Sequence, residues 1–467
     1  MKLASVFSDH AVLQREISIP VWGWTEPGTR VVAELGGVFA ATRSRTDGKF
    51  LLRLPPMKAG GPFELNVSGG GKSVVVRDVL IGEVWVASGQ SNMEWTVAAC
   101  GVQGEETIQA ATNEWIRMLT VPRKAMLGGQ GDVDSDWLVS SPDAAGDFSA
   151  VAYHFASRLQ DALDVPVGIL SSSWGGTIVE TWTSREALIQ NPDTQAWTER
   201  YEATLNTPEF WDDQQEGVQP PQPPMGPNNP NSPYMLFENM IVPLLPYAIR
   251  GAIWYQGESN ANRNMADKYR GMLVNMIRDW RRAWGQGDFP FIQVQLANYV
   301  AANDVSDMSW PLLREAQLQA VSEPGVGMAT IIDIGEANDI HPKNKLDVGR
   351  RLAQWALVKT YGREGVASGP LYSGMAIEGR VIRLRFENVG SGLVAQDGEA
   401  LSHFVVAGLD REFHPASATL EGSTVIVQGV DVPEPVAVRY AWADNPEGCN
   451  LYNRDGFPAS PFRTDSW

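Results

Sequence analysis

A serine placed just after an apolar strand is the most specific chemical signal in this chain. The pentapeptide Gly-Gln-Ser-Asn-Met at 89–93 directly follows the apolar run at 84–87. This order predicts a strand that ends in a tight turn and opens a helix, which presents Ser91 at the edge of a sheet where α/β proteins bind ligands. The helix N-terminus also favours developing negative charge. Two interpretations are open at this point, a nucleophile or a residue that only caps the helix.

A nucleophilic serine needs a general base, and the chain has five histidines. Three of them lie in β-rich parts of the sequence: His10, His403 and His414. His154 lies on a predicted helix at 149–163, where packing beside Tyr153 is its expected role. His341 is different, because it lies in a predicted loop between a strand and a helix. That position puts it at the same predicted sheet edge as Ser91.

Acidic residues that could orient this imidazole are available in two segments. Asp339 stands two residues before His341, and such a carboxylate can fix the tautomer and stabilise the imidazolium. Glu258, in the segment 254–260 after another predicted strand, could serve instead, or could only fix a neighbouring loop. In the same segment, Gln256 could point an amide N–H toward an oxyanion.

A further segment, Ser-Trp-Gly-Gly-Thr at 173–177, follows the strand predicted at 165–170. A glycine there lets a backbone N–H approach a reacting oxygen closely. An ordinary strand-to-helix turn is the alternative for this segment taken alone. All four segments lie at predicted C-terminal strand ends, and together they supply a nucleophile, two amide donors and an Asp-x-His pair.

The central part of the chain, about 79 to 365, must position these residues. Short apolar runs alternate there with helical patterns, which predicts a parallel sheet covered by helices on both faces. The expected strands are 84–87, 165–170, 249–254, 291–296 and 328–332, and the clearest helices are 149–163 and 269–284. Two segments are expected to be irregular loops, the one at 220–233 with seven prolines and the polar one at 298–311.

The regions 1–78 and 366–467 are predicted to be β-rich. Short alternating runs bounded by Gly, Pro and Asp occur at 17–22, 30–35 and 48–54, and again at 380–386, 424–427 and 437–440. The length of 467 residues also favours two or three domains. We therefore expect a central α/β domain between two β-rich regions, whose default role is to brace it.

Composition excludes several classes of partner. The formal net charge is −18, which argues against nucleic acid and against an anionic membrane surface. No run approaches the roughly 18 apolar residues of a membrane span. The first residues lack the apolar segment of a signal peptide, which favours the cytoplasm for the chain as it stands, or a trimmed export signal.

The two cysteines, Cys100 and Cys449, form no zinc motif and are expected to be free buried thiols rather than a disulfide.

Taken together, the four segments resemble the sialate O-acetylesterase and carbohydrate acetylesterase branch of the SGNH hydrolases. They are 89–93, 173–177, 254–260 and 339–342, and the opening at 6–15 is also similar to the N-terminal β region of bacterial members. The resemblance spans nearly the whole chain. It implies a flavodoxin-like three-layer α/β/α domain with a parallel sheet, and an enzyme that removes O-acetyl groups from a carbohydrate.

The resemblance also implies the role of each residue. Ser91 is the expected nucleophile and His341 the base. The oxyanion hole is expected from the Ser91 backbone N–H, the Gln256 side chain and a glycine of the 175–176 pair, with Gly175 as the first choice. Substrate contacts are expected from the remaining motif side chains: Gln90, Asn92, Trp174, Trp254 and Asn260. The implied mechanism is two-step acyl transfer, which requires neither a metal nor an organic cofactor.

One position departs from the family pattern, because SGNH enzymes commonly place the acid three residues before the histidine. That position is Asn338 here, so the third triad member is Asp339, or Glu258, or a backbone carbonyl.

The acetylated sugar is also open, with O-acetyl sialic acid and acetylated xylan or xyloglucan as the rivals. The negative net charge leans toward a neutral polymer. The alternative from another class is a carbohydrate-binding module with an inactive esterase core. A general lipase is disfavoured because no Gly-x-Ser-x-Gly elbow surrounds Ser91, and the oligomeric state stays unassigned.

Overall fold

The computed structural model describes residues 1–205, 226, 228–261, 265–300 and 308–467. Contacts divide the chain into two compact units, the first made of Met1–Gln256 and Gly271–Phe291, the second of Gly257–Arg270 and Ile292–Trp467. The sequence suggested three regions instead, with a boundary at 78–79. That position lies inside one unbroken strand, β8 (Lys72–Gly89), so the backbone runs from the N-terminal β region into the central sheet without a linker.

The N-terminal part of the first unit consists of short strands, as the alternating runs predicted. Its strands are β1 (Lys2–Leu3), β2 (Val12–Gln14), β3 (Ile19–Trp24), β4 (Arg30–Leu35), β5 (Val38–Arg43), β6 (Lys49–Leu54) and β7 (Gly60–Gly69). In β6, exposed and buried residues alternate along the whole strand, the pattern of a strand with one solvated face. Strands β1, β3 and β6 form one small sheet, and β4 pairs with β5 and β7.

Strand β8 is 18 residues long and belongs to two structures at once. Its first half pairs antiparallel with β7. Its second half lies between β11 (Val167–Ser173) and β12 (Gly251–Tyr255), parallel to both. Every residue from Val79 to Gly89 is buried, as expected for a central strand of a parallel sheet. The order continues outward through β9 (Asn113–Thr120) and the antiparallel edge strand β10 (Leu138–Ser140).

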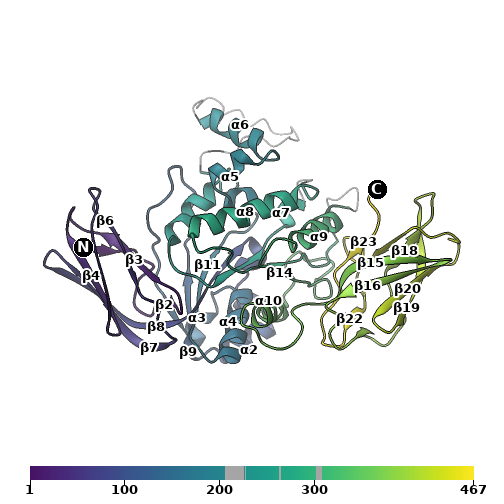
Figure 1. Ribbon diagram of the computed structural model, residues 1–467, viewed down its shortest axis with the longest axis horizontal. Coiled ribbons are helices and arrows are strands. Elements are labelled where there is room, and N and C mark those ends of the chain that lie inside the picture. The colour runs from purple at the N-terminus through teal and green to yellow at the C-terminus, as the bar shows by residue number, and fades with distance from the viewer. Residues whose placement is uncertain (206–225, 227, 262–264, 301–307) are drawn as a thin grey trace. The chain divides into compact units, whose positions relative to one another are not determined.

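Helices pack on opposite faces of these strands (Figure 1). From α4 (Ala150–Leu163), Phe155 contacts Trp85 of β8 with ring centroids 5.0 Å apart. From α8 (Tyr269–Trp284), Trp280 contacts Trp254 of β12 at 5.9 Å. Since Trp254 lies beside Ser88 and successive strand residues face opposite sides, Trp85 and Trp254 point to different faces.

The remaining helical segments of the first unit are short. They are α1 (Ser91–Glu94), α2 (Val102–Gln109), α3 (Pro142–Ala145), α5 (Arg185–Gln190), α6 (Gln195–Leu205) and single turns at 98–100, 179–182, 237–241 and 242–244.

A buried carboxylate holds the middle of β8 to its neighbours. Glu83 is fully buried, and its oxygens accept from the Nε atoms of Arg15 at 2.5 Å and Arg250 at 2.7 Å. Gln14, at the end of β2, donates to the same carboxylate at 3.2 Å. A buried charge is costly unless it is paired and hydrogen-bonded. These contacts supply both, and they connect β2, β8 and the residue that precedes β12.

The second unit combines helices with an antiparallel β region. Its first elements are α7 (Glu258–Ala261), β13 (Phe291–Val294), α9 (Ser309–Ala320), β14 (Val326–Ala329) and α10 (Lys345–Lys359). The C-terminal strands are β15 (Leu371–Glu378), β16 (Val381–Glu387), β17 (Leu393–Ala395), β18 (Phe404–Ala407), β19 (Phe413–Glu421), β20 (Thr424–Gly429), β21 (Ala437–Tyr440), β22 (Leu451–Asn453) and β23 (Phe462–Arg463). Inward residues such as Ile382, Leu384 and Val425 form the core of this β region.

Most predicted elements are confirmed, with shifted ends. The strands expected at 165–170 and 249–254 begin two residues later, in the first case after Pro166, which has no N–H for a ladder. The helices at 149–163 and 269–284 are α4 and α8. The loop expected at 220–233 lies outside the described residues at 220–225 and 227. The loop expected at 298–311 lies outside them at 301–307, and α9 begins within its last part, at Ser309.

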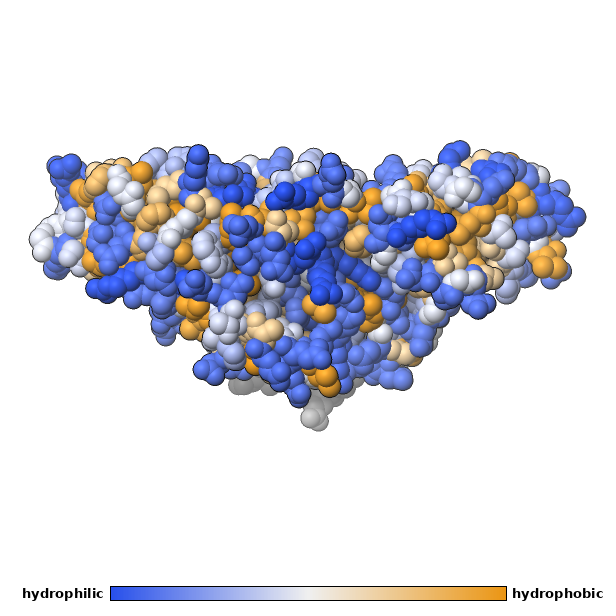
Figure 2. All heavy atoms as spheres, turned by 90° about the horizontal axis from the view of Figure 1, so that it is seen from below, coloured by the Kyte–Doolittle hydropathy of each residue, from blue (hydrophilic) through white to orange (hydrophobic). Residues whose placement is uncertain are grey.

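No helix among the described residues is long and apolar enough to cross a membrane. On the face shown in Figure 2, hydrophobic residues are interspersed with hydrophilic ones. Cys100 and Cys449 are both buried and free, as expected, and burial raises the pKa of the Cys449 thiol to about 11.

The end of β8 gives a direct test of the fold. Gly89 has a φ of +143°, and a Cβ at this position would lie 2.1 Å from the carbonyl oxygen of Tyr255. We therefore expect Gly89→Ala to destabilise the protein by about 2 kcal/mol or more, since backbone strain and overpacking act together. Thermal and chemical denaturation measure this. Gly128→Ala is the matched control, because Gly128 has a positive φ but nothing within 4 Å of its added Cβ. Equal stability of the two variants would contradict the expectation.

Candidate active site

The turn after β8 has the geometry that the sequence predicted for a nucleophile. The strand ends at Gly89, Gln90 is the N-cap of α1, and Ser91 is the first residue of that helix. The interpretation of Ser91 as the helix cap is therefore wrong, since the cap position belongs to its neighbour. The N–H of Gln90 donates to Tyr255 O at 3.0 Å, and Gly89 O accepts from Trp174 N–H at 3.1 Å. Backbone contacts to both neighbouring strand ends thus hold this turn.

Gly175, from the predicted 173–177 segment, lies directly against Ser91. A Cβ on Gly175 would come within 3.2 Å of Ser91 Cβ, so a larger residue would crowd the serine. Its backbone N–H donates to Oε2 of Glu94 at 2.8 Å. The structure thus brings Gly175 to Ser91 as predicted, but the amide expected to face an oxyanion is bound to a carboxylate.

Glu94 and Arg123 are two neighbours of this turn that sequence reasoning missed. Oε1 of Glu94 lies 3.1 Å from Nη1 of Arg123, and the Arg123 guanidinium lies 5.8 Å from the centre of the half-buried Trp174 ring. Glu94 could have been noticed, because it follows Ser91 by three residues and therefore lies on the same side of the helix. Nothing in the local sequence points from Arg123 to this turn, because their approach depends on the neighbouring strands β9 and β11.

Gln256 stands just after β12 and is buried. Its side-chain amide nitrogen donates to the carbonyl oxygen of Thr177 at 3.1 Å. This bond identifies the amide end of the side chain and fixes it beside the 173–177 segment. The predicted oxyanion donors of the first unit, Ser91, Gly175 and Gln256, thus all lie at the carboxyl ends of neighbouring strands.

Trp254 does not have the role expected for it. Its ring is fully buried and packs edge-on against Trp182 at 6.1 Å and against Trp280 at 5.9 Å. A substrate contact is therefore wrong for this residue, because its place on β12 turns the ring into the core beneath a helix. Gln90, Asn92 and Asn260 are also buried, and their contact with a substrate stays a prediction, as does that of Trp174.

In the second unit, Asp339 and His341 adopt a compact local arrangement. The backbone N–H of His341 donates to Oδ1 of Asp339 at 2.9 Å, and the same oxygen lies 3.8 Å from Nδ1 of the imidazole. The carboxylate is thus held beside the ring at ion-pair distance, though beyond hydrogen-bond distance. The expected loop is confirmed, but it is longer than predicted, since β14 ends at Ala329 and α10 begins at Lys345.

The surroundings of His341 favour its neutral form. Burial lowers the pKa of the imidazole, the positive charge of Lys345 lowers it further, and the carboxylate of Asp339 raises it. The net shift is downward from the usual 6.5. Lys345 is fully buried at the start of α10, so water screens its charge poorly. A neutral imidazole at pH 7 is the protonation state that a general base requires.

Glu258, the second candidate for the acid, opens α7 and is only 3% exposed. Asn338, at the position where SGNH enzymes commonly have their acid, is exposed. Asp339 is therefore the candidate acid whose carboxylate is seen near Nδ1 of His341, at 3.8 Å.

The other histidines have contacts of their own. Nδ1 of His10 pairs with Asp78 at 2.6 Å, and Nε2 of His403 lies 2.8 Å from a backbone carbonyl. His154 is buried on α4 with its ring edge-on to Tyr153, which confirms the packing role expected for it.

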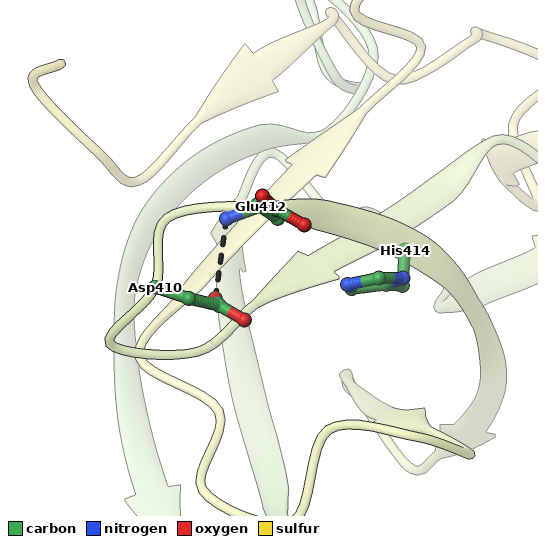
Figure 3. A group of neighbouring side chains, drawn as sticks. All are labelled: Asp410, Glu412 and His414. Atoms are coloured by element: carbon green, nitrogen blue, oxygen red, sulfur yellow. Dashed lines mark hydrogen bonds between the residues drawn. The ribbon is translucent and has the colours of Figure 1, made fainter.

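One group of side chains among the described residues could hold a metal ion. Asp410, Glu412 and His414 place one potential ligand atom each within 4.8 Å of the others (Figure 3). Both acids are exposed, and Glu412 N–H already donates to Asp410 at 3.2 Å. The group lies at the β18–β19 hairpin of the C-terminal β region, far along the chain from the predicted catalytic segments.

Comparison with known proteins identifies the family of the chain. Residues 232–358 match the family described as carbohydrate esterase, sialic acid-specific acetylesterase. The chain is 30% identical to sialate O-acetylesterase of Mus musculus over 99% of this chain and 94% of that protein, and 29% identical to that of Homo sapiens over 99% and 92%. It also resembles the crystal structure of a carbohydrate acetylesterase from Xanthomonas citri, with 39% identity, a TM-score of 0.88 and full coverage of both chains. The chain therefore belongs to the sialate O-acetylesterase family and, with it, to the carbohydrate O-acetylesterases.

Proposed function

We propose that this protein hydrolyses O-acetyl esters of a carbohydrate through an acyl-enzyme on Ser91. The observation that carries the proposal is the turn after β8, where Ser91 opens a helix beside Gly175 and its strand-end neighbours. His341 takes the proton of the Ser91 hydroxyl as the oxygen attacks the acetyl carbonyl. It then protonates the leaving sugar hydroxyl, and water releases acetate from the serine. The proposal also includes a central domain with the three-layer SGNH arrangement, flanked by β-rich regions.

The oxyanion hole in this proposal consists of the Ser91 backbone N–H, the Gly175 N–H and the Gln256 side-chain amide. Preorganised donors of this kind stabilise the negative charge that develops on the carbonyl oxygen. The bond from Gln256 to Thr177 O supports it, because it fixes the amide end of the side chain. Gly175 can contribute only if its hydrogen bond to Glu94 is exchanged for one to the substrate oxygen.

Asp339 is the acid that we assign to His341. Its carboxylate can draw the imidazole into the correct tautomer and stabilise the imidazolium that forms during attack. The distance of 3.8 Å to Nδ1 requires a small approach of the two side chains. Glu258 is the alternative, and a backbone carbonyl is the third.

The sugar that carries the acetyl group has two proposed forms, O-acetyl sialic acid and acetylated xylan or xyloglucan oligosaccharides. A sialate site needs a basic residue for the substrate carboxylate. Arg123 is a basic residue beside the Ser91 turn, but Glu94 neutralises it at 3.1 Å. This pairing favours a neutral sugar, whose apolar face Trp174 can stack against. A binding module with an inactive esterase core is the competing function.

Acetate release from the two substrate classes tests this proposal. We expect Ser91→Ala to lower kcat on the order of 10⁴-fold or more, because the nucleophile is lost while binding is kept. Ser391→Ala, in an exposed turn of the C-terminal β region, is the control and should keep full activity. Folded wild-type protein that binds acetylated xylo-oligosaccharides without releasing acetate would favour the binding module. Full activity of Ser91→Ala would mean that another residue is the nucleophile.

The pH dependence of kcat/KM tests the assignment of the base. Activity requires neutral His341, so it rises with pH through the pKa of this residue, and the midpoint should lie below the usual 6.5. Asp339→Asn removes the charge that raises this pKa, so the midpoint should move further down. If Asp339 also orients the ring, kcat falls by up to about 10⁴-fold in the same variant.

Glu258→Gln is the paired variant for the choice of acid. A larger loss of kcat in Glu258→Gln than in Asp339→Asn would reassign the acid to Glu258. A midpoint above 6.5 in the wild type, or an upward shift in Asp339→Asn, would contradict the described surroundings of His341.

A further inference from the structure

The carboxylate of Glu94 connects the helix of the nucleophile to the turn that faces it. Glu94 and Ser91 are the last and first residues of α1. Oε2 of Glu94 accepts the backbone N–H of Gly175 at 2.8 Å, a length typical of a bond to a charged acceptor. The side chain thus spans from the helix that carries Ser91 to the segment that follows β11.

The position of Gly175 decides how much space there is in front of the serine. Its Cα is so close to Ser91 that an added Cβ would lie 3.2 Å from Ser91 Cβ and 3.1 Å from Glu94 Oε2. A small displacement of Gly175 therefore changes the place where an acetyl group meets the nucleophile. Misplacement by about 1 Å at a reacting centre can cost about 100-fold in rate.

The turn after β11 depends on such side-chain contacts because its own backbone is unusually free. Gly176 is exposed, has a φ of +74° and has nothing near a potential Cβ. Two adjacent glycines leave many conformations open to the chain. The contacts that help to select one include Trp174 N–H to Gly89 O at 3.1 Å, Thr177 Oγ1 to Trp174 O at 2.7 Å, Asn231 Nδ2 to Gly176 O at 3.0 Å, and Gly175 N–H to Glu94 Oε2 at 2.8 Å.

Arg123 completes this arrangement on the solvent side. Its guanidinium pairs with Oε1 of Glu94, while Oε2 faces Gly175, so the two oxygens of one carboxylate have separate partners. The Arg123 side chain is 59% exposed, so the pair is screened by water and contributes little to stability.

We propose that Glu94 is a positioning residue for acyl transfer, which holds Gly175 at a fixed place beside Ser91. The inference rests on the proposed function of Ser91 as nucleophile. Glu94 takes no proton and forms no bond to the substrate in this role. It holds the Gly175 amide in place until the substrate oxygen takes over that N–H, as the proposed oxyanion hole requires. Arg123 orients Glu94 and has the smaller effect.

Steady-state kinetics of Glu94→Ala and Glu94→Gln on one acetylated oligosaccharide test the proposal. We expect Glu94→Ala to lower kcat roughly 10- to 100-fold with KM changed less than about threefold, because the turn loses its place while the sugar contacts remain. Glu94→Gln should stay within about fivefold of the wild type, since its side-chain oxygen can still accept the Gly175 N–H. Arg123→Ala should lower kcat less than Glu94→Ala does.

Thermal melting separates this role from a structural one. All three variants should melt within about 2 °C of the wild type, as expected for an exposed ion pair. Glu421→Ala, which removes an exposed pair with Arg383, is the matched control and should change neither kcat nor the melting temperature.

Several outcomes would overturn the proposal. A kcat of Glu94→Ala equal to that of the wild type would show that the 173–177 turn does not need the hydrogen bond from Gly175 to Glu94. A higher kcat would mean that the carboxylate blocks the Gly175 amide. Equal losses of kcat in Glu94→Ala and Glu94→Gln together with a lower melting temperature would indicate a structural role.

Labelling of Ser91 by a fluorophosphonate, followed by mass spectrometry, distinguishes a failure of the proposed nucleophile from a failure of the positioning role. If active wild-type protein carried no label on Ser91, the assignment of Ser91 as nucleophile would be refuted. A normal Ser91 label with unchanged Glu94→Ala kinetics would refute only the positioning role of Glu94.

Discussion

The close backbone contact between Gly89 and Tyr255 is the constraint on which the position of Ser91, the proposed nucleophile, depends. The two residues end neighbouring parallel strands, and no side chain fits between them, because a Cβ on Gly89 would lie 2.1 Å from Tyr255 O. The same turn is bonded on its other side to Trp174. Backbone hydrogen bonds therefore connect the ends of β8, β11 and β12 at the turn where the Ser91 helix begins. A reactive serine needs this rigidity, since its attack requires a fixed angle and distance.

Buried charges with complete sets of partners hold the segments around this constraint. Glu83 is fully buried in β8 and is paired with two arginines at the base of the sheet. In the second unit, fully buried Arg314 donates to four backbone carbonyls, those of Leu296, Ala297, Ala443 and Asp444. Burial lowers the pKa of Arg314 to about 10, although the negative charge of Asp444 raises it. Each charge connects chain segments that lie far apart in the sequence, at the cost of desolvation.

The electrostatic surroundings of Ser91 and of His341 differ, and each suits the role proposed for that residue. The Ser91 turn has a helix N-terminus and amide donors, which suit a developing negative charge. The loop before α10 keeps His341 neutral, because burial and Lys345 outweigh Asp339. In the proposed mechanism, a base of lowered pKa is ready to accept a proton at neutral pH, while Asp339 orients the ring and stabilises the imidazolium that forms.

The sequence alone determined the type of fold and the identity of the chemical groups. Alternating apolar runs predicted β4 and β21 with their correct ends, and four-residue spacing predicted α4, because local periodicity reports which face of an element is buried. The motif around Ser91 predicted a strand, a turn and a helix. The tertiary structure alone decided that Trp254 is a core residue and that the Gly175 amide binds Glu94. It also decided that β8 passes unbroken through the predicted domain boundary. These outcomes depend on contacts between strands far apart in the sequence, and the spacing of residues along one segment carries no information about them.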